Sequence, residues 1–254
     1  MKYVVGNLKM NILSPLERDC YFKLFKKEIV GIKFKNTEIV LCPPFVYLED
    51  FVSNLGGKYV RIGAQNVFEE RSGSYTGEIS PPMIKNLGAE YVIVGHSERR
   101  RYFGETNASA NLKLKASAKA GLHPVYCVGE TQEERDAGLT QNVVNLQIEE
   151  GLSDVPSAYL ENIILVYEPV WSVGTDVVPT SDEVMEARIL IKKILVDKYG
   201  AKFAERIKIL YGGSVKEKNI ERLCLEPGMD GVLVGRESLT PYEFIKLAQI
   251  ISEK

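Results

Sequence analysis

Histidine, tryptophan and cysteine are scarce in this sequence, which contains two, one and four of them, respectively. Cys20, Cys42, Cys127 and Cys224 stand far apart and form no CxxC pair. Structural zinc sites use closely spaced Cys and His ligands, and disulfide frameworks occur mainly in small secreted proteins. We therefore expect four free thiols in a reducing cytoplasm and no metal site.

The sequence also lacks an excess of charge of either sign. It has 32 Lys and Arg against 34 Asp and Glu, and the basic residues are scattered apart from the run Arg99–Arg101. The first eleven residues, MKYVVGNLKMN, lack the apolar core and cleavage site of a signal peptide. No apolar run approaches the roughly 20 residues that span a membrane. These absences predict a cytoplasmic protein that binds neither nucleic acid nor membrane, whereas a small charged metabolite would fit.

Short runs rich in Val and Ile recur along the chain. They are nearly unbroken rather than alternating, which is typical of parallel strands covered on both faces. The runs are YVVGN, TEIVLCP, YVRIGAQN, EYVIVGHS, HPVYCVGE, NIILVYEP, RIKILYGG and GVLVGRES.

Lys- and Glu-rich amphipathic segments lie between these runs and predict helices over 16–30, 112–121, 182–200 and 241–254. Ser14 and Thr180 are candidate N-caps, and Gly121 and Gly200 stand where helices should end. Strict alternation of strands and helices indicates βαβ units around a parallel sheet. The sequence contains no linker-like stretch. We therefore expect one α/β domain that spans residues 1–254, a single (β/α)8 TIM barrel, rather than a two-domain doubly wound protein.

Polar or glycine-rich residues follow each expected strand, and in a parallel barrel these ends meet on the face that carries active sites. Glu168 ends an apolar run, where burial makes a carboxylate a stronger base, so it is a candidate general base or else an exposed strand-end acid. His96 could donate to a substrate oxygen or be structural. Lys9 could attract an anion or lie on the surface.

Glycines mark the ends of the last two expected strands, in YGGS (211–214) and LVGR (233–236). Barrels frequently bind phosphate there, because backbone N–H groups can approach an anion closely. The alternative is that Gly212 and Gly213 only form a turn. A further loop, about residues 169–179, has a proline at each end and the lone Trp171 within it. This pattern suits a mobile lid, since the indole ring needs a packing partner in at least one state.

Eight motifs occur in order along the chain: GNLKMN (6–11), AQN (64–66), SYTGEIS (74–80), GHSERR (95–100), CVGET (127–131), YEPVWSVGT (167–175), YGGSV (211–215) and GVLVG (231–235). Together they closely resemble the triosephosphate isomerase family, in its order and spacing. The resemblance implies interconversion of dihydroxyacetone phosphate and glyceraldehyde 3-phosphate through an enediolate, a step of glycolysis and gluconeogenesis. It implies neither cofactor nor metal.

The resemblance also implies roles for individual residues. Glu168 matches the base that shuttles the carbon-bound proton, and His96 matches the neutral imidazole that polarises the carbonyl, a pairing for which this family is itself the reference case. Lys9 and Asn7 match the residues that bind substrate and stabilise its developing charge. The supporting positions are Ser97, Glu98, Cys127, Glu130 and Tyr211.

For the substrate phosphate, the matching backbone donors are those of Gly174, Ser214, Gly235 and Arg236. The lid is expected to close over the intermediate and to exclude water. A protruding loop with Tyr75, Thr76, Gly77 and Glu78 matches the one through which each subunit of the family reaches the other's active site, so the resemblance implies a homodimer.

Several positions depart from the family pattern. Leu8 replaces a common Trp, with only repacking expected. Asp176 replaces a lid glycine, and Pro179 removes an N–H that Tyr211 would bond in the closed lid, so this contact should be absent or rerouted.

The phosphate end departs as well. Arg236 replaces a glycine, which is tolerable if its φ is negative, because only its N–H is required. Glu237 should repel a phosphate unless Arg236 pairs with it. Two alternatives remain: a barrel that binds phosphate without catalysis, and another phosphate-binding barrel such as an amino-acid biosynthesis isomerase. The first does not explain four intact catalytic positions, and the second does not explain YEPVW or GHSERR.

Overall fold

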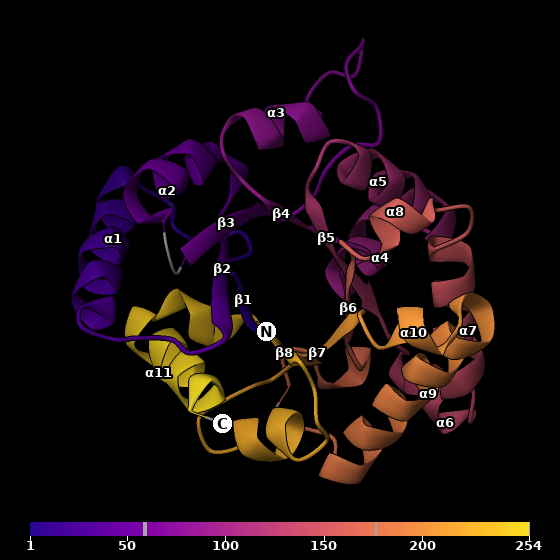
Figure 1. Ribbon diagram of the computed structural model, residues 1–254. Coiled ribbons are helices and arrows are strands. Elements are labelled where there is room, and N and C mark those ends of the chain that lie inside the picture. Colours follow the sequence, from indigo (N-terminus) through magenta and orange to yellow (C-terminus); the bar gives the residue numbers. More distant parts are fainter. Residues whose placement is uncertain (58–59, 176, 254) are drawn as a thin grey trace.

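The computed structural model describes residues 1–57, 60–175 and 177–253. Parallel strands form a closed barrel in the order β1 to β8, which confirms the predicted TIM barrel (Figure 1). Their bounds are β1 Lys2–Asn7, β2 Thr37–Cys42, β3 Val60–Ala64, β4 Tyr91–Val94, β5 His123–Val128, β6 Ile164–Tyr167, β7 Lys208–Gly213 and β8 Gly231–Val234. The barrel closes because β1 pairs with both β2 and β8, so that Val4 lies opposite Ile39 on one side and Val232 on the other.

Helices surround the barrel (Figure 1). The α-helices are α1 Pro15–Ile29, α2 Leu48–Leu55, α3 Pro81–Asn86, α4 Ser97–Phe103, α5 Asn107–Lys119, α6 Gln132–Asp136, α7 Thr140–Gly151, α8 Ser157–Leu160, α9 Ser181–Tyr199, α10 Ala201–Ala204 and α11 Pro241–Ser252. Shorter helical turns are η1 Phe45–Tyr47, η2 Val170–Ser172, η3 Glu221–Leu225 and η4 Arg236–Leu239.

The predicted helix caps are present. The Ser14 hydroxyl accepts from the N–H of Glu17 at 3.2 Å, before a proline in the first turn of α1. Thr180 and Glu183 exchange reciprocal side-chain to backbone bonds at the start of α9. These bonds satisfy N–H groups that the helix itself leaves unpaired. α5 begins at Asn107, earlier than the composition of its segment indicated, because Thr106 and Ser109 form a further capping box.

Every strand except β3 contributes to two apolar clusters, one on either side of the sheet. Val5 and Val40 belong to a cluster of strand residues enclosed by the barrel, whereas their neighbours Val4 and Ile39 pack with helix residues outside it. Side chains alternate between the two faces of a strand. Both faces are therefore buried, which explains why the strand sequences read as unbroken apolar runs.

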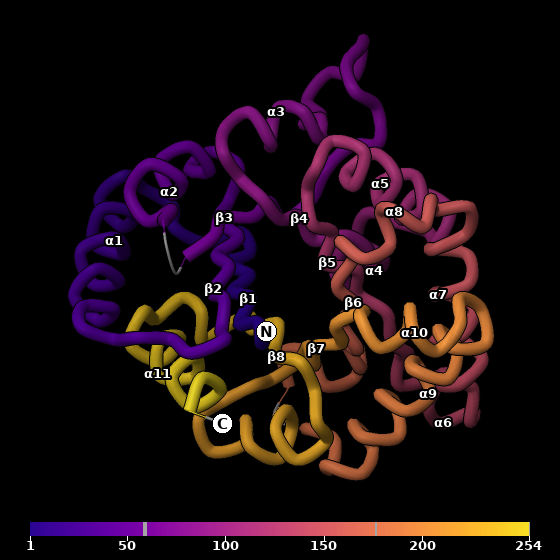
Figure 2. The backbone as a smooth tube through the Cα atoms, viewed as in Figure 1, coloured from indigo at the N-terminus to yellow at the C-terminus, as the bar shows by residue number. Residues whose placement is uncertain are grey.

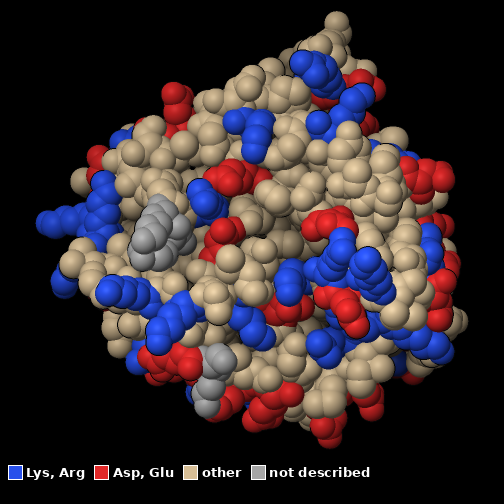
Figure 3. Space-filling model, in the orientation of Figure 1, with Lys and Arg blue, Asp and Glu red and all other residues tan. Residues whose placement is uncertain are grey.

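The segment between β3 and α3, residues 65–80, projects from the barrel (Figures 1 and 2). Lys and Arg are interspersed with Asp and Glu over the face drawn in Figure 3, in agreement with the balanced composition. Across the described ranges, no helix combines the length and apolar character needed to cross a membrane.

Candidate active site

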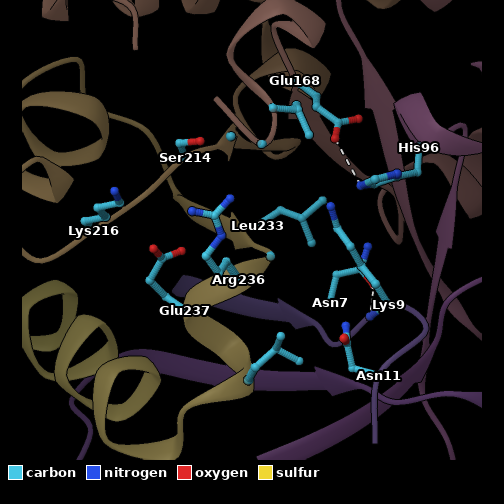
Figure 4. Close-up of a pocket in the computed structure, with 15 residues that line it drawn as sticks. Asn7, Lys9, Asn11, His96, Glu168, Ser214, Lys216, Leu233, Arg236 and Glu237 are labelled. Atoms are coloured by element: carbon cyan, nitrogen blue, oxygen red, sulfur yellow. Dashed lines mark hydrogen bonds and ion pairs between the residues drawn. The ribbon is translucent and has the colours of Figure 1, made fainter. Parts of the chain in front are cut away.

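A cavity of about 220 Å³ opens where the strands end, and every residue predicted to act in catalysis or to bind phosphate lines it (Figure 4). These residues are Asn7, Lys9, His96, Glu168, Gly174, Ser214, Gly235 and Arg236. Asn11, Val173, Gly213, Lys216, Leu233, Glu237 and Leu239 complete the lining. The cavity thus joins the carboxyl ends of β1, β4, β6, β7 and β8.

Glu168 and His96 contact each other at one edge of this cavity (Figure 4). Glu168 Oε1 lies 3.0 Å from His96 Nε2, and Glu168 Oε2 accepts from the N–H of Ser97 at 2.9 Å. Both side chains are buried, with 4% and 6% of their surfaces exposed. A buried carboxylate with a polar opening in front of it is equipped to accept a proton from a ligand.

The hydrogen bonds of His96 define its protonation state. Nδ1 accepts from the N–H of Glu98 at 3.2 Å, at the first turn of α4. A nitrogen that accepts carries no proton, so the imidazole is neutral and bears its hydrogen on Nε2. The N-terminus of α4 also disfavours a positive ring beside it. His96 is therefore a hydrogen-bond donor that faces the cavity.

Lys9 is held in a rare backbone conformation, with φ of 53°. A left-handed non-glycine residue costs on the order of 1–3 kcal/mol and needs support from its surroundings. Its N–H donates to Asn7 Oδ1 at 3.0 Å, and its carbonyl accepts from Gln65 Nε2 at 2.8 Å. Its ammonium lies 2.6 Å from Glu98 Oε1. These contacts aim the lysine into the cavity, with the Glu98 carboxylate beside its ammonium.

Glu130 anchors the segment that follows Glu168. Its buried carboxylate accepts from Trp171 Nε1 at 2.8 Å and from the Tyr167 hydroxyl at 3.1 Å, and its carbonyl accepts from the N–H of Val170. Burial raises the pKa of Glu130, and the bonds from Trp171 and Tyr167 oppose that rise. The guanidinium of Arg135 lies 3.9 Å from the Trp171 ring centroid. Trp171 thus has the packing partner that the sequence led us to expect.

Tyr211 and Ser214 hold the next part of the same loop. The Ser214 hydroxyl lies within hydrogen-bonding distance of two carbonyls, that of Ser172 at 3.0 Å and that of Thr175 at 2.8 Å, and its one proton is shared between them. The Tyr211 hydroxyl lies 3.3 Å from Ser172 Oγ. Tyr211 is therefore bonded near the beginning of the loop, at Ser172, rather than at its end, where Pro179 lies. Asp176, the other unusual lid residue, lies outside the described residues.

Cys127 and Gly129 lie on β5 and just after it, behind the cavity. Burial, reinforced by the charge of Glu168, raises the pKa of the Cys127 thiol well above its ordinary value, so the thiol is protonated. A Cβ added to Gly129 would lie 2.0 Å from the Glu168 carbonyl oxygen. The close approach of these two strand ends therefore requires glycine.

Sequence reasoning missed Glu105, which supports the end of β4. Its Oε1 accepts from the N–H of Gly95 at 2.6 Å, and its Oε2 contacts Arg99 Nε at 2.8 Å and Lys113 Nζ at 2.7 Å. Burial tends to raise its pKa, but Lys113, Arg99 and Gly95 together lower it below its ordinary value. No local pattern could have found this residue, since an acid within FGETN reads as part of a surface turn.

Two further expectations concern the edges of the site. Leu8 is fully buried, consistent with simple repacking at that position. The φ angle of Arg236 is not positive, so its backbone can adopt the conformation of the glycine that it replaces.

The residues of the projecting loop, Tyr75, Thr76, Gly77 and Glu78, are exposed and do not line the cavity of this chain. Within the described ranges, no three His, Cys, Asp or Glu side chains are grouped to hold a metal ion.

Comparison with known proteins agrees with this geometry. The family model described as triosephosphate isomerase matches residues 2–251. The chain is 43% identical over 241 residues to the triosephosphate isomerase of Moorella thermoacetica, covering 95% of both chains. It is 40% identical over 250 residues to that of Carboxydothermus hydrogenoformans, covering 97% of both, and 42% identical over 243 residues to that of Dictyoglomus thermophilum, covering 96% of both. The chain belongs to the triosephosphate isomerase family.

Proposed function

We propose that this chain, acting as one domain over residues 1–254, interconverts dihydroxyacetone phosphate and D-glyceraldehyde 3-phosphate without a metal or cofactor. It is then an aldose–ketose isomerase that acts in glycolysis and gluconeogenesis. The observation that carries the proposal is the buried pair of Glu168 and neutral His96, 3.0 Å apart, on a cavity that Lys9 also lines. This arrangement combines a base, a hydrogen-bond donor and a cation around one small space.

In the proposed reaction, Glu168 takes a proton from the hydroxyl-bearing carbon of dihydroxyacetone phosphate. The C–H electrons form the carbon–carbon double bond of an enediolate, and the carbonyl electrons move to oxygen, where the His96 Nε2–H donates. The Lys9 ammonium and the Asn7 amide stabilise the developing negative charge. A proton passes from the former hydroxyl oxygen to the former carbonyl oxygen, and Glu168 returns its proton to the adjacent carbon, so that an aldehyde and a new hydroxyl form. Both oxygens of Glu168 already accept hydrogen bonds, so substrate binding must exchange one of them.

The phosphate end of the substrate is proposed to bind the backbone N–H groups of Gly174, Ser214, Gly235 and Arg236. All four line the cavity, and Ser214 and Arg236 lie on the side of it away from His96 (Figure 4). Gly174 belongs to the loop 169–179, so gripping the phosphate would draw this loop over the intermediate. Closure would exclude water and protect the enediolate from losing its phosphate.

We propose a second copy of this chain as the partner. Large apolar side chains are exposed in the segments that follow β1, β2, β3 and β4, among them Met10, Val46, Met83 and Phe103. Exposed apolar side chains in neighbouring segments are typical of protein interfaces. The projecting loop 65–80 leaves the same part of the barrel. Light scattering at micromolar concentration should give twice the mass of one chain, and a monomer would contradict the homodimer.

The experiment that tests the reaction is a coupled assay of glyceraldehyde 3-phosphate isomerisation with purified protein and a Glu168→Asp variant. Shortening the base by one methylene moves its carboxylate by about 1 Å, which can cost about 100-fold or more in turnover. Glu161→Asp is the matched control, because this acid lies in an exposed ion pair with Arg206. An inactive wild-type protein, or full activity in the Glu168→Asp variant, would contradict the proposal.

A further inference from the structure

Arg236 projects its side chain into the phosphate end of the cavity. It is the first residue of η4 and follows Gly235 directly. In Figure 4 its guanidinium extends from η4 into the space beside Ser214 and Leu233, and all three residues line the cavity. The backbone and the side chain of Arg236 therefore border the same space.

Within the described part of the chain, the Arg236 guanidinium forms no hydrogen bond or ion pair. Three arginines of α4 and α6, by contrast, are bonded. Arg99 pairs with Glu105, Arg100 with Asn107, and Arg135 with Glu183. A guanidinium carries five N–H donors in a planar fork, so an unbonded one at a cavity is available to a ligand.

The neighbouring acid does not use this guanidinium. Glu237 also lines the cavity, yet no ion pair joins it to Arg236 among the described residues. In Figure 4 its carboxylate points toward the side of η4 on which Lys216 lies. The pairing that would have cancelled both charges is therefore not formed.

The other cationic side chains that line the cavity already have partners. Lys9 is engaged with Glu98, and Lys216 also has a partner in the structure. Glu237 places a negative charge near the expected phosphate, which opposes the binding of a dianion. Guanidinium and phosphate match in geometry, because two parallel N–H groups can meet two phosphate oxygens.

We propose that the Arg236 guanidinium binds the substrate phosphate directly and offsets the repulsion from Glu237. The inference rests on the proposed function and deepens it, since the backbone N–H groups alone were expected to hold the phosphate. Arg236 is then a binding residue with two kinds of donor. It acts on affinity for the anion rather than on proton transfer.

The test uses inorganic phosphate as a competitive inhibitor of the isomerase reaction, with full-length wild-type protein and Arg236→Ala. Alanine keeps the backbone N–H, so the variant isolates the guanidinium. We expect the inhibition constant of phosphate and the KM of glyceraldehyde 3-phosphate each to rise about tenfold, as for a charge-assisted bond at an exposed site. The value of kcat should stay within about twofold, because the bond is equally present in the ground and transition states.

Further variants identify the interaction. Arg236→Lys should fall between wild type and Arg236→Ala, because it keeps the charge and loses the fork. Glu237→Gln should tighten phosphate inhibition. Arg222→Ala is the control, since Arg222 is an exposed arginine that lines a neighbouring cavity and its loss changes the net charge equally. Phosphate inhibition of this control should match that of wild type.

The outcomes separate the two proposals. A wild-type protein without isomerase activity contradicts the proposed function. An active wild type whose phosphate inhibition is unchanged in Arg236→Ala overturns the guanidinium contact alone. A loss of kcat at unchanged KM in Arg236→Ala also overturns it, because that result indicates a structural effect. Phosphate inhibition that weakens equally in Arg222→Ala overturns it as well, because that result indicates a general electrostatic effect.

Discussion

Replacing Glu105 by Gln removes the negative charge from the buried cluster behind β4. The Glu105 side chain is 1% exposed and that of Lys113 is 8% exposed, so water screens this pair little. Gln keeps the volume and one acceptor for the N–H of Gly95. It leaves the Lys113 ammonium buried opposite a neutral amide.

The expected cost follows from this burial. Removing one partner of a buried ion pair costs about 3–5 kcal/mol, and the oxygen that Gln retains places the cost near the lower end. For a chain of this size, about 3 kcal/mol corresponds to a decrease of about 6–12 °C in Tm. Glu161→Gln is the matched control. It breaks the pair with Arg206, whose side chains are about half exposed, and should cost less than about 1 kcal/mol.

The pH dependence of the stability provides an independent test of the contribution of the Glu105 charge. Burial tends to raise the pKa of Glu105, but Lys113, Arg99 and Gly95 together lower it below the ordinary value of 4.5. A lowered pKa in the folded state means that the charge stabilises the fold above the unfolded pKa. This stabilisation is lost as the pH falls through the folded pKa. The stability gap between wild type and Glu105→Gln should therefore narrow below about pH 4.5.

Equilibrium urea unfolding of wild type, Glu105→Gln and Glu161→Gln, at one protein concentration and several pH values, measures both effects. Fixed concentration matters because a dimer gains stability by mass action. A Glu105→Gln protein within about 1 kcal/mol of wild type at pH 7 would refute the reasoning. So would a stability gap that stays constant on acidification.

Three further predictions concern the loop and its base. Tyr211→Phe removes the hydroxyl bonded to Ser172 and should lower kcat by up to about tenfold. The Tyr211→Phe/Ser172→Ala double variant should be no slower than Tyr211→Phe, because both changes remove the same contact. Additive losses of kcat would exclude this contact. Pro179→Ala restores an N–H at the loop end and should change turnover or the rate of loop closure, followed by fluorescence of Trp171, the only tryptophan; identical rates would contradict this role. Gly129→Ala would place a Cβ 2.0 Å from the main chain of the proposed base, Glu168, so isomerase activity should fall at least about 100-fold. Unchanged activity would show that the two strand ends can separate.

Much of the barrel was predictable because its strands have a distinct sequence pattern. Val4 and Val5 pack on opposite sides of β1, and both sides are covered, so the run is apolar throughout. The alternation of such runs with capped amphipathic segments indicates a parallel barrel. Closure then brings the polar strand ends together. Glu168 and His96 could for that reason be placed in one cavity before their distance was known.

Partners that approach from distant parts of the chain were decided by the tertiary structure. Glu105 became recognisable only when Gly95, Arg99 and Lys113 converged on it, since no local pattern marks an acid as buried. The contact between the Tyr211 and Ser172 hydroxyls joins residues 39 positions apart and depends on where two strands end.

Adjacent residues show the same division. Arg236 and Glu237 are neighbours of opposite charge, and the sequence left open whether they pair. In the fold, η4 directs the guanidinium into the cavity, and the two side chains form no ion pair among the described residues. The sequence by itself determined the barrel, the family and which candidate residues share one cavity, because these follow from local patterns. Contact between side chains depends on the direction of each one, and only the packed backbone sets that direction.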